Sequence, residues 1–302
     1  MLRSSLLVLP ILLTSCDFEG LQSGRFREDF HLSYKLEPGQ RVSVENTNGS
    51  IEISGWDKHE VDISGERYAV TEEYLRLLKV DVQTSPTSVR IRTLKPPRTG
   101  WGGPGGGVKY VIRVPRQTLL DRVESTNGSL RVEDVQGNAL LRSTNGSIRL
   151  YRDQGAYDLA TTNGSIEFAV HAGDVKARTT NGGIRAEDLN GGLTAETTNG
   201  GIYARLGGAA SQVRLETTNG GIEVLAEKQP AGVLASTTNG GIAVRLPADL
   251  KASVRANSGS SITSEFPLAG DVEKKRVRAT INGGGPLLEL TTNNGRIRIE
   301  RM

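Results

Sequence analysis

The chain has little of what most catalytic and metal sites need. Cysteine occurs once in 302 residues, at Cys16, so no internal disulfide can form. The three histidines, His31, His59 and His171, lie far apart in the sequence. Because a metal centre needs several such ligands close together, the sequence predicts no metal and no cofactor. We also expect no catalytic residues and therefore no enzyme.

An excess of one charge is also lacking. The 37 Lys and Arg residues nearly balance the 34 Asp and Glu residues, which leaves a net charge of +3. Nucleic-acid binding usually requires a basic face, so no nucleic-acid partner is expected. Aromatic residues are few, with two Trp, seven Tyr and five Phe. Most of the core must therefore be built from small aliphatic and Thr side chains.

What the chain does have is a repeat. The dipeptide Asn-Gly returns every eighteen residues at first and then at slightly longer spacing. The asparagines of these units are Asn127, Asn145, Asn163, Asn181, Asn199, Asn219 and Asn239. Further copies stand at Asn48, around Ser258 and at Asn294. A fixed period of this kind indicates that one structural unit is stacked repeatedly.

Each unit alternates as two strands joined by a turn. In one unit Val175, Ala177 and Thr179 share one face, and Ile184 resumes that face after the turn. An Ile or Leu stands three residues after every turn Asn, and such columns are produced by parallel stacking of coils. We predict an all-β fold: a single-stranded β-solenoid (β-helix) of about 18–20 residues per coil, with an N-terminal capping region that contains a short helix. The competing interpretation is a string of β-hairpins, because Asn-Gly is a strong hairpin signal.

The turn asparagines favour a structural role over a binding role. Asn and Gly both tolerate the left-handed backbone region, which a tight corner can require. A stacked column of Asn can also exchange side-chain hydrogen bonds from one coil to the next.

The first sixteen residues read as an export signal. Arg3 precedes the apolar run from Leu6 to Leu13, which is too short to span a bilayer. The run ends in Leu-Thr-Ser-Cys and resembles a bacterial lipobox, which implies that Cys16 is lipidated and becomes the mature N-terminus. The expected partner at this end is the membrane, and the expected location is the bacterial cell envelope, with the chain facing the periplasm or the exterior. The alternative is an ordinary signal peptide with an incidental cysteine.

The rest of the chain divides into three parts. Residues 17–37 are interpreted as a tether, 38–120 as a β-rich capping region and 121–302 as the repeat solenoid. Within the cap, Thr71 to Leu78 predicts a two-turn helix with a Thr cap. Four apolar side chains are expected to cover the open end of the solenoid: Trp56, Tyr74, Leu75 and Leu78. In the glycine-rich segment 98–107, which lacks the Lys-Ser/Thr of a phosphate loop, Trp101 is the candidate for partner contact.

Several phrases in this order resemble the bacterial DUF4097 family. They are Val44-Glu-Asn-Thr-Asn-Gly-Ser-Ile, Gly55-Trp-Asp-Lys-His-Glu-Val61, the segment from Thr71 to Leu78, Tyr110-Val-Ile-Arg-Val-Pro115 and the train of Thr-Asn-Gly-Gly-Ile units. The resemblance covers about residues 38–300. It implies a β-solenoid in a cell-envelope setting and a candidate adhesin, with no catalytic or binding residues to carry over.

Two functions compete. The first is a non-enzymatic, lipid-anchored envelope protein that displays its solenoid for adhesion, scaffolding or binding of an envelope protein or glycan. The alternative is a polysaccharide-acting β-helix enzyme, which requires two carboxylates close together on one face. The acid pairs Glu133-Asp134 and Glu187-Asp188 occupy equivalent columns but stand three coils apart. At about 4.8 Å per coil this separation is too great for a catalytic pair.

Overall fold

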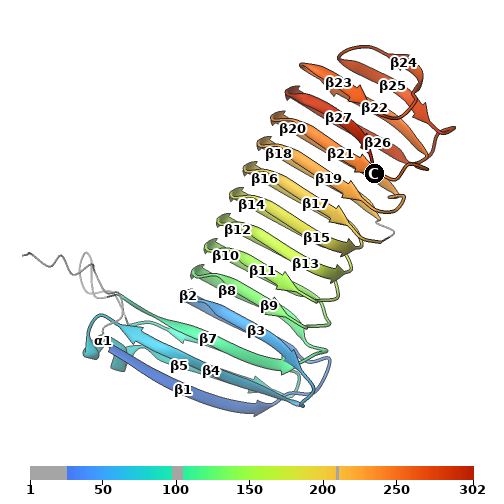
Figure 1. Ribbon diagram of the computed structural model, residues 1–302. Coiled ribbons are helices and arrows are strands. Elements are labelled where there is room, and N and C mark those ends of the chain that lie inside the picture. The colour runs from blue at the N-terminus through green and yellow to red at the C-terminus, as the bar shows by residue number, and fades with distance from the viewer. Residues whose placement is uncertain (1–25, 97–104, 209–210) are drawn as a thin grey trace, which may run out of the picture.

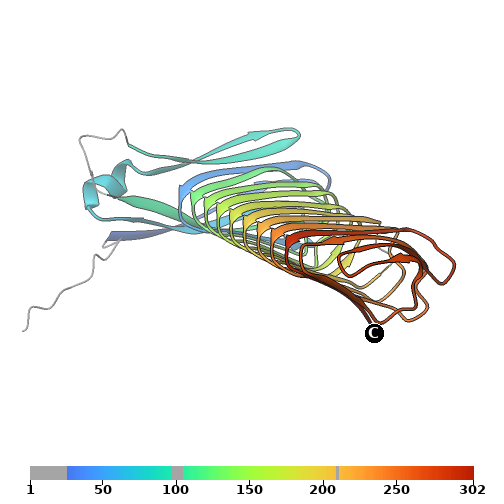
Figure 2. The same ribbon diagram turned by 90° about the horizontal axis from the view of Figure 1, so that it is seen from above.

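The computed structural model describes residues 26–96, 105–208 and 211–302. These residues form two long sheets of 13 and 14 strands that face each other and are built almost entirely from stacked parallel strands (Figure 1). We refer to the 13-stranded sheet as the first sheet and to the 14-stranded sheet as the second sheet. Viewed along the stack, successive turns of the chain overlie one another as flattened loops (Figure 2). The predicted β-solenoid is confirmed.

One rung consists of a strand in the second sheet, an Asn-Gly corner and a strand in the first sheet. The central rungs follow one another in chain order: β8 (Leu119–Asn127) with β9 (Leu130–Glu133), β10 (Ala139–Asn145) with β11 (Ile148–Tyr151), β12 (Tyr157–Asn163) with β13 (Ile166–Ala172), β14 (Val175–Asn181) with β15 (Ile184–Asn190), β16 (Leu193–Asn199) with β17 (Ile202–Leu206), β18 (Gln212–Asn219) with β19 (Ile222–Ala226), and β20 (Gly232–Asn239) with β21 (Ile242–Leu246). Ile184 pairs with Ile166 on one side and with Ile202 on the other. The strands on the two sides of a corner belong to different sheets, so the hairpin interpretation is wrong.

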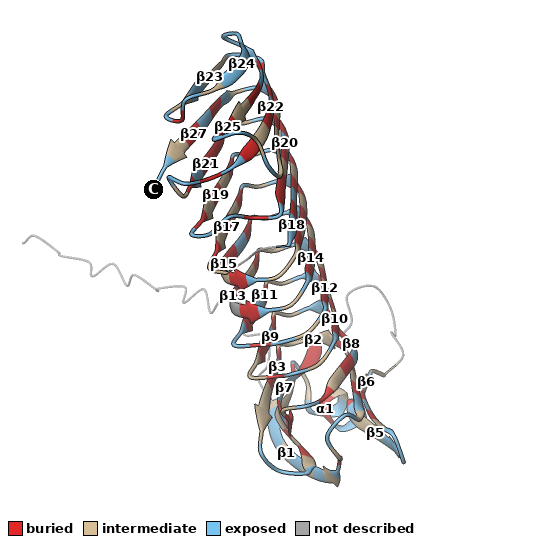
Figure 3. Ribbon diagram, turned by 90° about the vertical axis from the view of Figure 1, so that its right-hand side faces the viewer, coloured by how far each residue is buried: buried red, intermediate tan, exposed pale blue. Residues whose placement is uncertain are grey.

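The core is a thin layer between the two sheets. Buried and exposed residues alternate along the strands, as Figure 3 shows. Val175, Ala177 and Thr179 are all buried in this layer. The buried Thr hydroxyl is not left unpaired, because Thr179 Oγ1 donates to the carbonyl oxygen of Gly164 over 2.9 Å. The same bond recurs from Thr161, Thr197, Thr217, Thr237 and Thr292 to a glycine of the preceding rung in the stack. A hydroxyl can therefore occupy the dry side at little cost.

At the C-terminal end, the order of rungs in space departs from their order in the chain. After β21 the chain forms β22 (Ala252–Ser258) and β23 (Ser261–Ser264), and then the antiparallel strands β24 (Ala269–Val272) and β25 (Arg276–Ile281). The last rung, β26 (Leu287–Asn294) with β27 (Arg296–Arg301), then lies between the β20/β21 rung and the β22/β23 rung. The last rung of the chain is therefore an internal rung of the stack. Its two strands pair with neighbouring strands on both sides.

The N-terminal end is closed in a related way. The rung of β2 (Arg41–Asn48) and β3 (Ile51–Trp56) pairs on one side with β8 and β9. On its other side it pairs with β6 (Ser88–Leu94) and β7 (Gly106–Pro115), which are followed outward by β5 (Lys79–Ser85), β4 (Glu60–Ala69) and β1 (Phe26–Lys35). These outer strands pair antiparallel.

Two expectations for this region need correction. Residues 17–37 were interpreted as a tether, but Phe26–Lys35 form strand β1, which pairs with β4 over ten residues. The half-buried Phe30 and Leu32 pack against the core from this strand. Trp56 does not cover the end of the solenoid. Its indole donates to the carbonyl oxygen of Glu60 at the turn between β3 and β4.

The predicted helix is confirmed as α1 (Glu72–Leu77). Thr71 is its N-cap and accepts a hydrogen bond from the backbone N–H of Tyr74. Leu75 and Leu78 are buried, and Tyr74 packs against the core. In the part of the chain that the structure describes, no helix is long and apolar enough to cross a membrane.

Candidate functional site

The Asn-Gly corners form a continuous ladder along one edge of the solenoid. The side-chain amide of Asn181 donates to Oδ1 of Asn163 over 2.8 Å, and Asn199 donates to Asn181 in the same way. The same contact joins each neighbouring pair in the series Asn48, Asn127, Asn145, Asn163, Asn181, Asn199, Asn219, Asn239 and Asn294. The expected side-chain ladder is present, and every predicted turn asparagine is part of it.

The backbone reason for the glycines differs from the expected one. None of the turn asparagines has a positive φ; among described non-glycine residues those are Asp134, Arg152, Asp188 and Asn282. From Asn127 to Asn294 neither residue of the Asn-Gly pair uses the left-handed region, and Gly49 in the first corner is the exception, with a φ of 115°. The first glycine of each corner is needed because the rungs approach closely. A Cβ on Gly182 would lie 2.0 Å from the carbonyl oxygen of Gly164, where no real Cβ is found.

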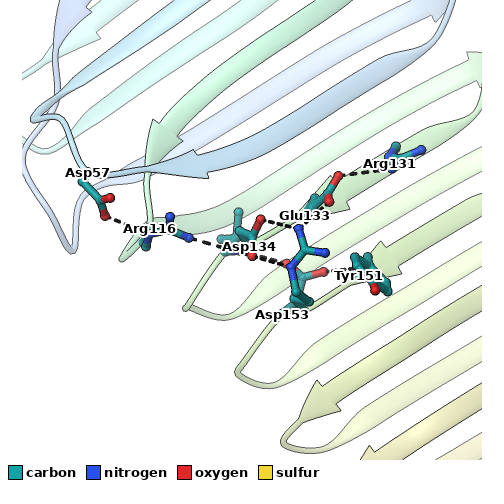
Figure 4. Close-up of polar contacts among 9 residues, drawn as sticks. Asp57, Arg116, Arg131, Glu133, Asp134, Tyr151 and Asp153 are labelled. Carbon is teal, nitrogen blue, oxygen red and sulfur yellow. Dashed lines mark hydrogen bonds and ion pairs between the residues drawn. The ribbon is translucent and has the colours of Figure 1, made fainter.

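The opposite edge carries a cluster of charged residues (Figure 4). Arg152 binds Glu133 Oε1 at 2.6 Å and Asp134 Oδ2 at 2.7 Å. Arg116 binds Asp57 at 2.8 Å and approaches Asp134 at 3.8 Å. The hydrogen bonds from Arg152 lower the pKa of Asp134, so this carboxyl group stays ionised at neutral pH. These ion pairs connect neighbouring rungs to one another and to the turn after β3.

A second polar group lies just inside this edge. Asp153 is 2% exposed and accepts hydrogen bonds from the backbone N–H groups of Val135 and Tyr151, at 2.9 and 3.0 Å. Burial raises the pKa of Asp153 to about 7, although the two N–H donors oppose this in part. It is the one described carboxyl group for which we find a raised pKa. Because it is sealed from solvent and bound by backbone, it supports the corner and cannot reach a substrate.

His171 and Tyr157 complete this interior group. Their rings pack edge to face at 4.8 Å between centroids. His171 Nε2 contacts the carbonyl oxygen of Gly155 at 3.0 Å, while its buried Nδ1 has no hydrogen-bond partner. Burial lowers the pKa of His171, which favours the neutral ring. Sequence reasoning missed this group, because nothing in the sequence distinguishes Asp153 or His171 from an exposed polar residue.

Both outer faces carry open grooves. One lies on the second sheet, with a volume of about 710 Å³. Two of its carboxylates are already engaged: Asp158 pairs with Arg142 at 3.0 Å, and Asp174 accepts from the backbone N–H of Gly192 at 2.8 Å. The other groove lies on the first sheet, has a volume of about 790 Å³ and runs from β13 to β27. We refer to it as the axial groove, because its lining residues come from six rungs that are adjacent in the stack.

The other residues that the sequence singled out are placed as follows. Cys16 and Trp101 lie outside the described residues. The acid pairs of the enzyme alternative are held by different arginines, Glu133 and Asp134 by Arg152 and Asp188 by Arg205. Among the described residues, no group of three or more His, Cys, Asp or Glu side chains is placed to hold a metal ion.

Residues 108–300 match the family model described as Toastrack DUF4097. The chain belongs to the Toastrack DUF4097 family. No curated protein matches it in sequence. A candidate adhesin from Bacteroides fragilis is similar to it in structure, with 12% sequence identity, a TM-score of 0.47 and coverage of 91% of this chain and 97% of the other. A candidate cell-adhesion protein from Clostridium sporogenes aligns with 10% identity, a TM-score of 0.24 and coverage of 91% and 100%.

The Toastrack match runs from β7 to β27 and so contains the solenoid rungs from β8 onward. The resemblance seen in the sequence extended further, to about residue 38. The phrases that begin at Val44 and Gly55 lie outside the matched residues. The strands β1 to β6, which include the β2/β3 rung, therefore lie outside the family match.

Proposed function

We propose that this chain is a lipid-anchored cell-envelope protein that binds a partner on the outer faces of its solenoid and does not transform it. One observation carries the proposal. The strand register and the Asn ladder continue from Asn48 to Asn294. Such stacking gives a stiff, extended surface of repeated side chains, which suits adhesion or scaffolding.

The charged residues of the outer faces support binding over catalysis. Most glycoside hydrolases need one carboxylic acid with a raised pKa beside a second carboxylate. Here Glu133 and Asp134 converge on one arginine, which lowers the pKa of Asp134. The carboxyl group with a raised pKa, Asp153, lies in the sealed interior. No specific observation favours the polysaccharide-acting enzyme.

The anchor rests on the sequence. Cys16 ends the apolar run at the position that a lipobox requires, and two or more acyl chains anchor a protein stably.

The experiment compares the full-length chain with its Cys16→Ser variant in bacterial cells. The wild-type chain is expected in the membrane fraction, and crosslinking in intact cells is expected to capture envelope protein or glycan. The variant should leave the membrane or remain unprocessed. Normal cleavage with full membrane retention of the variant contradicts the anchor. Release of new reducing ends from envelope polysaccharide by the purified chain contradicts the non-catalytic role.

A further inference from the structure

The floor of the axial groove is a column of four glycines. Gly183, Gly201, Gly221 and Gly241 are the second glycines of their Asn-Gly-Gly corners and follow one another up the first sheet. At the two ends of this column the same position carries a side chain, Ser165 before the glycines and Arg296 after them, and both residues line the groove. The groove therefore lies where the side chains are missing.

The backbone does not require these four glycines. A Cβ on Gly183 or Gly201 would lie 3.3 Å from the next carbonyl oxygen, a contact that a shift of a few tenths of an ångström relieves. The same position holds Ser147 and Ser165 in two earlier rungs of the same shape. The first glycine of each corner is different, because a Cβ on Gly200 would lie 2.1 Å from a carbonyl oxygen. The fold therefore requires the first glycine of each corner. The second glycine is explained by the open axial groove, which we also call the channel.

The dimensions of the channel fit an extended chain. From Ser165 to Arg296 the floor crosses five inter-strand steps, or about 24 Å at about 4.8 Å per step. Its wall carries the half-buried ring of Tyr203, and the guanidinium of Arg185 stacks on that ring at 4.4 Å. An aromatic face beside polar groups is a surface on which a sugar ring can stack while its hydroxyl groups bond to the wall.

The charge of the channel selects among glycans. Three arginines and two glutamates line it: Arg185, Arg296, Arg298, Glu167 and Glu223. Glu167 is paired with Arg149, and Glu223 is paired with Arg245. Arg296 makes no ion pair among the described residues and stands exposed at one end of the glycine floor. Arg185 and Arg298 are also paired, with Glu187 and Glu300, so Arg296 is the lining charge that stays unpaired among the described residues. This unpaired guanidinium complements a negatively charged chain.

A peptide strand is a poor occupant of the same channel. Extended peptides bind sheets by adding a strand at an unpaired edge. The floor of the channel is formed by rungs that pair with neighbours on both sides, so their backbone donors and acceptors are already used. Recognition must come from side chains and from the shape of the floor.

Building on the proposed envelope function, we propose that the axial groove binds an acidic polysaccharide whose chain lies along the solenoid axis, with Tyr203 and Arg296 as contact residues. The glycine column admits the chain, the aromatic ring stacks on a sugar and the free guanidinium binds a carboxylate. The observation that supports this most directly is the absence of side chains at four successive positions where the fold accepts them.

The test is calorimetric titration of the full-length chain carrying Cys16→Ser, which leaves every described residue intact. The probes are an oligogalacturonate, a neutral cello-oligosaccharide of equal length and a polyglutamate peptide. The oligogalacturonate is expected to bind, and the other two are expected to bind at least about tenfold more weakly, a difference of about 1.4 kcal/mol. Absence of oligogalacturonate binding, or equal binding of either other probe, overturns the proposal.

The matched variants locate the site. Gly201→Leu with Gly221→Leu should block the channel and weaken oligogalacturonate binding at least about tenfold, or about 1.4 kcal/mol. Ser147→Leu lies in the same column but outside the channel and should leave binding unchanged. If the double leucine variant does not fold, as monitored by circular dichroism, Gly201→Ser with Gly221→Ser replaces it, because the fold carries Ser in this column.

Arg296→Gln should weaken binding and reduce its dependence on salt. Unchanged affinity in the blocked variant, with Arg296→Gln also unchanged, refutes the site. Such a result leaves membrane retention and crosslinking in cells untouched, so it is distinguishable from failure of the envelope function.

Discussion

The side-chain amide of Asn181 donates to Oδ1 of Asn163 in the rung before it, and its own Oδ1 accepts from Asn199 in the rung after it. Each bond spans 2.8 Å. One asparagine therefore connects three rungs without contacting the core. In a solenoid, stability is roughly a sum of rung terms and interface terms, so the ladder contributes at every interface.

Replacing Asn181 with Ala should lower the free energy of unfolding by about 1–2 kcal/mol, because two exposed side-chain hydrogen bonds are lost. The measurement is urea-induced unfolding monitored by circular dichroism. Thr180→Ala is the control, because Thr180 is an exposed neighbour in the same strand, and it should stay within about 0.5 kcal/mol of wild type. Binding by the folded variant should persist. Loss of binding with an unaltered unfolding curve would mean that Asn181 contacts the partner.

The two glycines of one corner should respond differently to alanine. In Gly182→Ala the new methyl would lie 2.0 Å from a backbone oxygen, so rungs must separate and stability should fall by about 2–3 kcal/mol or more. In Gly183→Ala the contact is 3.3 Å, and a small steric cost is offset by about 0.4–1 kcal/mol from the stiffer unfolded chain. Thermal unfolding of both variants checks this difference. Equal losses would show that the second glycine is also a backbone requirement.

The repeating part of the fold could be predicted from the sequence because its columns fix the register. Ile184 between Ile166 and Ile202 is a pairing that the period specifies directly. The place of the last rung could not be predicted, because Asn294 carries the same corner as any other rung and its residues do not encode which neighbour it joins. Asn239 bonds to Asn294 although 55 residues separate them.

The expectation that the corners use the left-handed backbone region was wrong, except at Gly49, for a related reason. Asn-Gly is usually interpreted from two-residue hairpins, in which the chain returns within one sheet. Here the chain passes from one sheet to the other, and steric contact with the preceding rung decides the glycine. The buried group around Asp153 was missed because its burial depends on how the loops of neighbouring rungs stack, which the period of the strands does not report.

Asp153 should make stability depend on pH. Its folded pKa of about 7 lies above its ordinary value of 3.8, so the folded chain binds more protons than the unfolded chain between about pH 4 and 7. The free energy of unfolding should therefore decrease as the pH rises through this window, by roughly 4 kcal/mol at most. The contribution is fully present below about pH 4 and is lost as the pH passes about 7.

The Asp153→Asn variant tests this dependence, because an amide stays neutral across the window. Urea unfolding at several pH values should give a wild-type curve that falls relative to the variant curve. His171 acts in the opposite direction, since its lowered pKa makes protonation at low pH unfavourable for the folded state. Both proteins contain His171, so its effect cancels in the difference. A difference that is constant with pH would show that Asp153 titrates normally.

The inward and outward columns should differ most strongly under substitution. Ile184 is 1% exposed between two other isoleucines, so Ile184→Asp buries a carboxylate with no partner and should cost several kcal/mol. Arg185 faces outward, pairs with Glu187 and stacks on Tyr203. Arg185→Gln should cost about 1 kcal/mol or less, because exposed ion pairs and cation–π contacts contribute little. The measurement is the shift in melting temperature of each variant relative to wild type. Similar shifts would mean that the two faces of the strand are equally wet, which contradicts a closed interior and removes the basis for assigning the binding surface to the outer face.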